Sequence, residues 1–440
     1  MEMTGQTRSR DQISIDVREP DEDLVASIRE KMENISYLHC ICRVDKHLSE
    51  PNPRAYIPDK VSIGPYHHNS NEVLKAMEDQ KWHYVHTLLN RKPNLEASID
   101  DCVTALREVE HRARACYHGG IGGDCSSDQF LQMMFVDGCF IIELFLKYSI
   151  KSLRRRNDPI FSTPGMLFDL RCDLILLENQ IPLFVLQRLF QVVPKPKECT
   201  SSFAELAFRF FRNMIPGDPK INREKFNQEA HHLLDIICHC LLPTYPREVT
   251  SKPSKFENDE DLPSLTELKA SGVRVKIART DNLLDIKFSK GVLRIPPIVV
   301  HQYTESLFRN LIALEACSTD SMQHITSYAV FMKTLLRVDK DVKLLKRREI
   351  LTSYDVSEKE VDKLFAVLCS GVKLKEYYYD GLCEQLNEYK EGIGWHKKLK
   401  YGKKHGKNPQ LRSILLVAML VLLLTLVGTL FSVLSFVHRF

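Results

Sequence analysis

The sequence lacks several patterns that would direct a protein out of the cytosol or attach it to a lipid. Residues 1–20 are polar and contain no apolar signal-peptide region, the start does not fit myristoylation, and the end is not a prenylation box. The 13 cysteines are odd in number and include no Cys-x-x-Cys pair. We therefore expect reduced thiols in a cytosolic setting, most of them packed as small apolar side chains.

Acidic residues are also missing from the last part of the chain, since no Asp or Glu follows Glu391. The 24 residues 414–437 carry no charge, and 17 of them are Leu, Ile, Val or Phe. A helix of that length reaches roughly 36 Å, which exceeds the thickness of a hydrocarbon core of ~30 Å. The sequence therefore predicts one transmembrane helix over residues 413–437.

A basic stem over residues 396–412 precedes this hydrophobic segment. Its cations are Lys397, Lys398, Lys400, Lys403, Lys404, Lys407 and Arg412. The positive-inside rule places such a stem, and the residues before it, on the cytosolic side of the membrane. We expect a tail-anchored, single-pass protein of the plasma membrane or an endomembrane, whose stem contacts anionic lipid.

The rest of the chain has the composition of a folded globular protein, 44% hydrophobic and 27% charged. Residues 1–18 are expected to be disordered, and residues 19–395 to form one large cytosolic helical domain made of two halves. A stretch rich in Pro, Lys, Asp and Glu over about 243–263 predicts an exposed linker. The formal net charge is +4, and the stem alone supplies seven positive charges, so the domain is near neutral or slightly acidic. This balance argues against nucleic-acid binding.

Hydrophobic periodicity predicts helices over most of this domain. In its second half they span residues 304–316, 322–338, 342–350, 357–368 and 374–389. Between the two halves, residues 273–277 alternate, and residues 284–288 and 292–295 flank Ser289-Lys290-Gly291, which is typical of a β-hairpin. The predicted fold class is mainly α, with a large helical domain, a small antiparallel β-hairpin element and one C-terminal transmembrane helix.

The two most apolar segments of the domain, residues 128–150 and 166–190, contain polar side chains. These are Asp137, Glu143, Arg171, Glu178 and Asn179. Charges in such surroundings must be paired or must reach the surface. We expect a structural network in which Arg171 and Asn179 satisfy the acids. Helical spacing places Arg171 and Glu178, seven residues apart, on one face.

The alternative is a membrane-bound hydrolase or transferase that uses Asp137, Cys139, Glu143 or Glu178. It is disfavoured because no partnered nucleophile is present and because the acids are expected within helices rather than on loops.

A cluster of His and Cys over residues 229–242 is the best metal candidate. It comprises His231, His232, Cys238, His239 and Cys240. The two sulfurs of a Cys-x-Cys on a helix point about 200° apart, which suits one ion poorly. His67 and His68 have no cysteine or acid at a ligand spacing nearby and are expected in a packed turn. The sequence therefore predicts no metal site and no cofactor.

Long motifs follow one another in an order that resembles one family. They include CICRV, VSIGPYHH, MEDQKWHYVHTLL, EHRARACY, DGCFIIELF, DPIFSTPGMLFDLRCDLILLENQIPLFVL, LLDIKFSKGVLRIPP, ESLFRNLIALEAC and ITSYAVFMKTLL. The chain resembles the plant-specific family that carries domain of unknown function 247, from about Tyr37 to the hydrophobic C-terminal segment. The resemblance implies a plant membrane protein, and some grass members are linked to self-incompatibility. No catalytic residues are established for the family, so none is carried over.

These observations predict a non-enzymatic, tail-anchored protein that acts in protein–protein recognition or signalling, with self-incompatibility-like recognition as one setting. Its partner is an unidentified protein. A structural membrane tether is a further alternative. In the hydrophobic segment, Thr425, Gly428, Ser432 and Ser435 form a stripe of small residues, which lets two helices approach closely. The stripe predicts a possible homodimer through the transmembrane helix.

Overall fold

The computed structural model describes residues 24–25, 28, 40–68, 70–91, 99–119, 121, 125–217, 230–243, 263–280, 282–318, 322–405 and 417–429, with side chains omitted over 393–405. The residues 1–18, which were expected to be disordered, lie outside these ranges, and so does nearly all of the expected linker. Four of the predicted site residues also lie outside them, namely Lys407, Arg412, Ser432 and Ser435.

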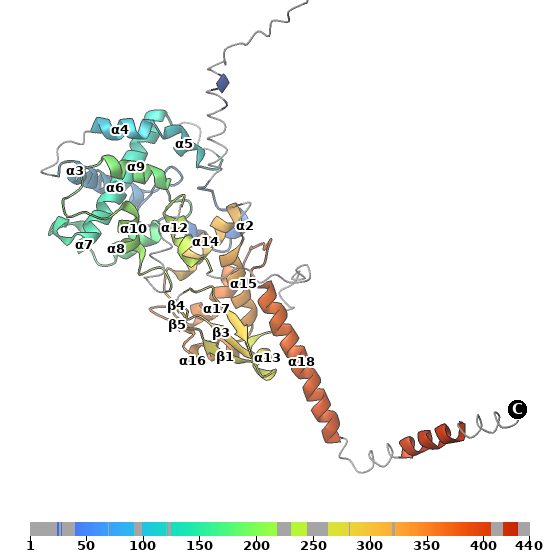
Figure 1. The fold of residues 1–440 in the computed structure, drawn as a ribbon. Coiled ribbons are helices and arrows are strands. Elements are labelled where there is room, and N and C mark those ends of the chain that lie inside the picture. Colours follow the sequence, from blue (N-terminus) through green and yellow to red (C-terminus); the bar gives the residue numbers. More distant parts are fainter. Residues whose placement is uncertain are drawn as a thin grey trace, which may run out of the picture.

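The first half of the chain forms a helical group around α6 (Ser127–Ser149), shown in blue to green in Figure 1. α3 (Glu72–Leu89), α4 (Ile99–Arg107), α9 (Leu183–Val192) and α10 (Phe203–Phe211) pack directly on α6. The other elements of this group are α2 (Lys46–Ser49), two 3-10 turns (Pro53–Tyr56 and Lys151–Leu153), α5 (Glu110–Ala115), α7 (Pro159–Ser162), α8 (Met166–Asp173) and α12 (Leu233–Leu241).

Helix α6 is the centre of this group because it is apolar on every side. Its N-terminus is fixed by a capping box between Ser126 and Gln129, as the sequence around Ser126 indicates. It is the one helix in the described part of the chain that is long and apolar enough to cross a membrane, and 83% of its most apolar window is buried within the protein. That burial identifies α6 as a core helix.

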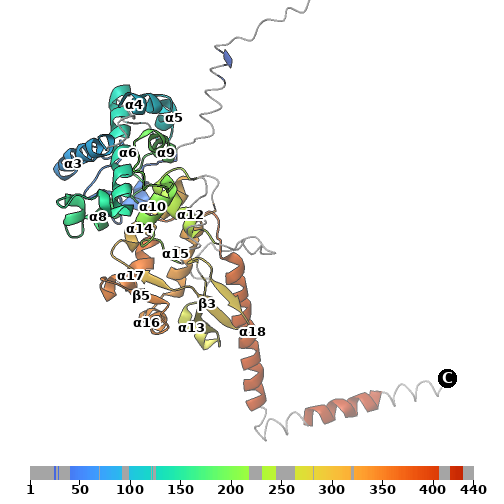
Figure 2. The same ribbon diagram turned by 60° about the vertical axis from the view of Figure 1, so that its left-hand side comes forward.

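The second half combines helices with short strands. Its helices are α13 (Leu265–Ala270), α14 (Thr304–Cys317), α15 (His324–Leu335), α16 (Asp339–Arg347), α17 (Glu358–Leu368) and α18 (Asp380–His405). β1 (Arg274–Ile277), β3 (Val292–Ile295) and β2 (Lys287–Ser289) form a sheet in that order, and β4 (Ile298–Val300) pairs with β5 (Leu351–Ser353). One continuous core joins the two halves, and α18 extends away from the second (Figures 1 and 2).

The β-hairpin is confirmed. β2 and β3 are antiparallel, and the turn residues Lys290 and Gly291 have φ values of 49° and 72°, as a tight two-residue hairpin turn requires. The sequence did not predict that β1 would pair parallel to β3, nor that β4 and β5 would be parallel. These pairings join segments that are distant in the chain, so local alternation does not reveal them.

The mainly helical fold class is confirmed by the structure, whereas a spanning C-terminal helix is not shown. In the described residues the hydrophobic segment contains a helix over Val417–Thr429 only, which is too short to qualify as a span. The predicted boundaries of α14 and α17 agree with the structure to within about one residue at each end.

Candidate functional site

An open cleft of about 590 Å³ lies beside α3 and α6 in the first half of the molecule. Its apolar lining includes Trp82, Met133 and Val136, and its polar lining includes Glu78 and Asp137. The remaining lining residues are Pro65, His68, Ile121, Cys125, Gln129 and Gln132. Trp82 is 44% exposed, which is high for a tryptophan in a helix that packs on the core. The cleft therefore combines an accessible aromatic ring with two carboxylates.

A buried lysine sits between these two carboxylates. The Nζ atom of Lys81 lies 2.6 Å from Glu78 Oε1 and 2.7 Å from Asp137 Oδ1, and it also donates to the carbonyl oxygen of Ser62 at 2.5 Å. Burial acts against the charged form of Lys81, but the charges of Asp137 and Glu78 outweigh it and raise the pKa of the lysine. Burial also raises the pKa of Asp137, while Lys81 opposes that change. One internal cation thus serves two acids.

Asn179 and Asp137 hold the segment 61–64 in the core. The side chain of Asn179 accepts from the Ile63 amide at 2.7 Å and donates to the Val61 carbonyl at 3.0 Å. Asp137 accepts from the Gly64 amide at 2.8 Å. The sequence predicted a network around these residues, but Asn179 binds the backbone of this segment rather than the acids themselves.

Glu143 forms a separate buried ion cluster deeper along α6. Its carboxylate lies 2.5 Å from the Arg91 guanidinium and 3.9 Å from the ammonium group of Lys147. Lys147 in turn pairs with Asp158 at 2.8 Å, and Asp158 accepts from the hydroxyl of Tyr84 at 2.7 Å. Burial raises the pKa of Glu143, with Arg91 acting in the opposite direction. Arg91 and Lys147, not Arg171, neutralise this acid.

The predicted pairing of Arg171 with Glu178 is wrong, because the helix that would align them ends early. α8 stops at Asp173, so Glu178 lies in the turn before α9 and not on the helical face of Arg171. Arg171 donates to the Phe210 carbonyl at 2.8 Å and stacks over the rings of Tyr148 and Phe210. The expectation that every candidate acid lies within a helix is also wrong for Glu178.

Glu178 instead ties the N-terminal segment to this turn. It accepts from the Val44 amide at 2.7 Å and lies 3.3 Å from His67 Nε2 and 4.0 Å from Arg43. Burial acts to raise the pKa of Glu178, but the contacts with His67 and Val44 outweigh it and hold the pKa below its usual value. Cys139, the thiol named among the catalytic alternatives, is fully buried and does not line the cleft.

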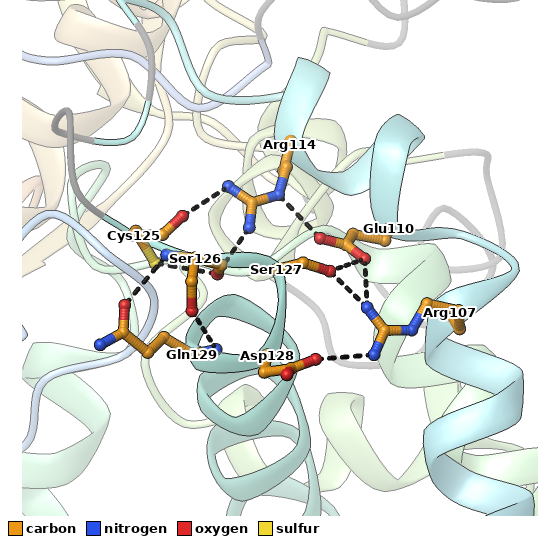
Figure 3. Close-up of polar contacts among 8 residues, drawn as sticks. All are labelled: Arg107, Glu110, Arg114, Cys125, Ser126, Ser127, Asp128 and Gln129. Atoms are coloured by element: carbon orange, nitrogen blue, oxygen red, sulfur yellow. Dashed lines mark hydrogen bonds and ion pairs between the residues drawn. The ribbon is translucent and has the colours of Figure 1, made fainter.

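The rim of the cleft at the start of α6 is fixed by an ion and hydrogen-bond network (Figure 3). Arg114 binds Glu110 at 3.0 Å and donates to the carbonyl oxygens of Cys125 and Ser126 at 3.3 and 2.8 Å. Arg107 binds Glu110, the hydroxyl of Ser127 and, at 2.8 Å, the carboxylate of Asp128. Because Cys125 and Gln129 line the cleft, this network positions part of its wall.

No group of three or more potential metal ligands occurs in the part of the chain that the structure describes. Cys238 and Cys240 are buried in α12, as core packing predicts. His232 caps the N-terminus of α12 by accepting from the Asp235 amide at 3.2 Å, and its Nε2 lies 3.0 Å from the Cys40 carbonyl oxygen. Burial lowers the pKa of His232 to about 4.

Sequence reasoning missed Lys81 and misplaced Trp82. Helical spacing in the sequence favours an apolar face of Trp82, Val85 and Leu89, whereas the structure buries a different face of α3. The buried residues are Leu74, Lys81, Tyr84, Val85 and Leu88. A signal was present, because Lys81 is seven residues from Leu74 and seven from Leu88. A lysine on the buried stripe of a helix requires an internal acid.

The structure describes only some of the residues that were predicted to contact or cross a membrane. Lys397, Lys398, Lys400, Lys403 and Lys404 belong to the backbone of α18. Thr425 and Gly428 lie on the helix over Val417–Thr429, where the Thr425 hydroxyl donates to the Leu422 carbonyl at 2.8 Å.

The structure thus shows a mainly helical protein with a cleft lined by Trp82, Glu78 and Asp137, in which both acids pair with the buried Lys81. The chain belongs to the DUF247 family, described as a plant protein of unknown function, whose model matches residues 41–425. It is 30% identical to UPF0481 protein At3g47200 of Arabidopsis thaliana over 423 residues, covering 91% of this chain and 87% of that protein. A second UPF0481 protein of that plant, At3g02645, is 26% identical over 448 residues, covering 80% of this chain and 82% of the relative. No solved structure matches the chain.

Proposed function

We propose that this protein is a membrane-attached recognition protein that binds a segment of another protein in the cleft beside α3 and α6. The observation that carries this proposal is the exposed ring of Trp82 within a cleft that also contains Met133 and two carboxylates. Tryptophan and methionine are enriched at protein interfaces, and tryptophan is among the residues that contribute most to binding.

The charge of the cleft indicates what the partner presents. Glu78 and the buried Asp137 line the cleft, and both pair with the ammonium group of the fully buried Lys81. Glu78 retains 20% exposure and can accept a further hydrogen bond from a bound side chain. We expect the partner segment to place an apolar side chain against Trp82 and a Lys or Arg near Glu78, because complementary charge favours that pairing.

The ion pairs of the buried acids favour a binding function over a catalytic one. Asp137 is paired with Lys81 and the Gly64 amide, and Glu143 is paired with Arg91 and Lys147. A hydrolase or transferase remains the competing proposal, and the raised pKa of Asp137 at the cleft is the observation that favours it. That reading requires Asp137 to exchange protons with a substrate while Lys81 holds it at 2.7 Å.

Membrane attachment through residues 413–437 is the second part of the proposal. The described helix Val417–Thr429 is exposed along its whole length, and Leu422, Leu423 and Leu424 are 63–65% exposed. An exposed helix surface that consists mostly of Leu and Val is stable in lipid. If residues 1–410 are cytosolic, protease added to intact microsomes will digest a tag before Met1 and spare a tag after Phe440. The reverse pattern would contradict this orientation.

Site-specific photo-crosslinking in the native plant tissue tests the recognition proposal. A photoreactive amino acid at Gln132, which lines the cleft, should crosslink to a defined protein, whereas the same probe at the exposed Lys363 on α17 should not. Trp82→Ala and Glu78→Gln should each reduce the Gln132 crosslink several-fold without lowering the melting temperature by more than a few degrees. The same crosslinked protein from both probe sites, or a yield unaffected by both substitutions, would refute binding in the cleft.

The family resemblance suggests self-incompatibility-like recognition as one setting for this binding. Identification of the crosslinked protein would test that setting directly, because such recognition requires a partner from the opposite side of the mating interaction.

A further inference from the structure

A second concavity, of about 600 Å³, lies at the exposed side of the three-stranded sheet in the other half of the molecule. Four of its five lining residues are cations, namely Lys276, Arg279, Arg294 and Arg348, and the fifth is Ile277. All four cations are exposed. No acid belongs to the lining of this concavity, which is called here the basic pocket.

The register of the sheet places like charges side by side. Lys276 of β1 lies opposite Arg294 of β3, and Lys287 of β2 lies opposite Arg294 on its other side. Three strands thus contribute a row of three cations to one face of the sheet. Like charges directly opposite one another, such as Lys276 and Arg294, destabilise a sheet.

The other two cations come from the ends of elements. The Ala278 amide donates to the Ile295 carbonyl at 2.8 Å, which continues the β1–β3 ladder and brings Arg279 to the edge of the pocket. Arg348 is the C-cap of α16, and the left-handed residue Glu349, with φ of 57°, turns the chain from α16 into β5. The pocket is therefore assembled by three separate parts of the chain.

No described carboxylate forms an ion pair with any of the four cations. The hydrogen bonds of the described residues give Arg294 a neutral partner, the hydroxyl of Ser289 at 3.2 Å. Asp281, which is near Arg279 in the sequence, lies outside the described residues. Three guanidinium groups and one ammonium group thus line one concavity, and none of the four is paired with a carboxylate among the described residues.

We infer that the basic pocket binds a small anion that carries several phosphate groups, of the kind formed by a phosphorylated inositol. Guanidinium groups bind phosphate oxygens in a bidentate manner, and an ammonium group adds a further point charge. A volume of about 600 Å³ accommodates one such ring with its phosphates. A bound anion would offset the repulsion between Lys276 and Arg294, because both cations would then be attracted to it.

The ligand chemistry has two sources, a membrane lipid headgroup and its soluble counterpart. The sheet is attached to α18, because α18 packs on β2 and the rings of Phe288 and Tyr389 lie 5.3 Å apart in an edge-on arrangement. α18 contains the first ten residues of the stem, 396–405, so the basic pocket belongs to the part of the domain that is connected to the proposed membrane anchor (Figure 1).

Calorimetric titration of the full chain in detergent with inositol hexakisphosphate is the first test. The double variant Lys276→Gln/Arg294→Gln should bind at least tenfold more weakly than the wild type. The matched double variant Lys343→Gln/Lys363→Gln removes the same charge from exposed sites on α16 and α17 outside the pocket and should bind within twofold of the wild type. Without ligand, the pocket variant should melt at the same or a higher temperature, since it removes a repulsive pair. Equal weakening in both variants, or no binding by the wild type, would overturn the inference.

The second test distinguishes the two sources. The full chain is placed in nanodiscs that contain either phosphatidylinositol bisphosphate or an equal charge of phosphatidylserine, and lysine acetylation is mapped by mass spectrometry. Protection of Lys276 in the first nanodisc but not in the second supports the lipid headgroup as the source. Protection only after addition of inositol hexakisphosphate supports the soluble form. Protection in neither case, or equal protection by phosphatidylserine, would overturn a phosphate-specific pocket.

Discussion

Replacing Lys81 by Met removes the one cation between two carboxylates and leaves Asp137, which is 2% exposed, without its ionic partner. At the Nζ–Oδ1 distance of 2.7 Å and an effective dielectric of about 20, the lost attraction is about 6 kcal/mol. The lysine no longer has to be desolvated, and the Gly64 amide still binds Asp137 at 2.8 Å. We therefore expect Lys81→Met to lower the free energy of unfolding by roughly 3–5 kcal/mol at pH 8.

The pH dependence of this loss follows from the pKa of Asp137. Burial already raises that pKa in the wild type, and removal of Lys81 raises it further. The folded variant then holds a proton that the unfolded chain has released, so its stability falls as the pH rises above the unfolded pKa of about 4. The deficit of Lys81→Met relative to wild type should be smaller at pH 5 than at pH 8.

Urea unfolding of the full chain, followed by tryptophan fluorescence, measures both effects, because Trp82 is adjacent to Lys81. The control is Lys81→Met/Asp137→Asn, which removes the buried charge while leaving an acceptor for the Gly64 amide. It should recover most of the lost stability, since removing both partners of a buried pair is often close to neutral. A deficit below about 1 kcal/mol, or one that is equal at the two pH values, would refute the ionic account of this cluster.

Substitutions at three further positions, Ser126, Glu315 and Gly64, test the packing and the charges of the fold. Ser126→Ala, which removes the cap of α6, should cost about 1 kcal/mol in urea unfolding, and Ser126→Asp should restore it. Burial raises the pKa of Glu315 to about 7, so wild-type stability should fall by up to roughly 3 kcal/mol between pH 4.5 and 8, and Glu315→Gln should flatten this slope in pH-dependent melts. Gly64→Ala places a methyl group 2.4 Å from the Gln180 carbonyl oxygen at φ of 74° and should lower the melting temperature by several degrees, whereas an unchanged temperature would contradict the close packing of this segment.

Local patterns sufficed wherever neighbours in the sequence decide the structure. The hairpin turn at Lys290–Gly291 was predicted from a few adjacent residues and is present, and the capping boxes of Ser126 with Gln129 and of Ser357 with Glu360 depend on the same kind of local pattern. Each depends on backbone conformation and hydrogen bonds within one turn, so the sequence contains the complete signal.

The charged residues show the limit of this reasoning. That Asp137 and Glu143 need partners followed from their apolar surroundings, but the identity of those partners did not. Lys81 precedes Asp137 by 56 residues, and Arg91 precedes Glu143 by 52, so no helical spacing connects them. The choice of Arg171 for Glu178 assumed one continuous helix, and the end of α8 at Asp173 removed that assumption.

The sequence by itself determined the mainly helical class, the central apolar helix, the hairpin and the family resemblance, because each rests on short-range pattern or on long matching motifs. Only the tertiary structure decided which cation neutralises which acid, that Trp82 faces solvent at a cleft, and that β1 and β3 bring cations together at the basic pocket. These features depend on the packing of elements that are distant in the chain. Each contact forms, and stabilises the protein, only when the whole core has assembled.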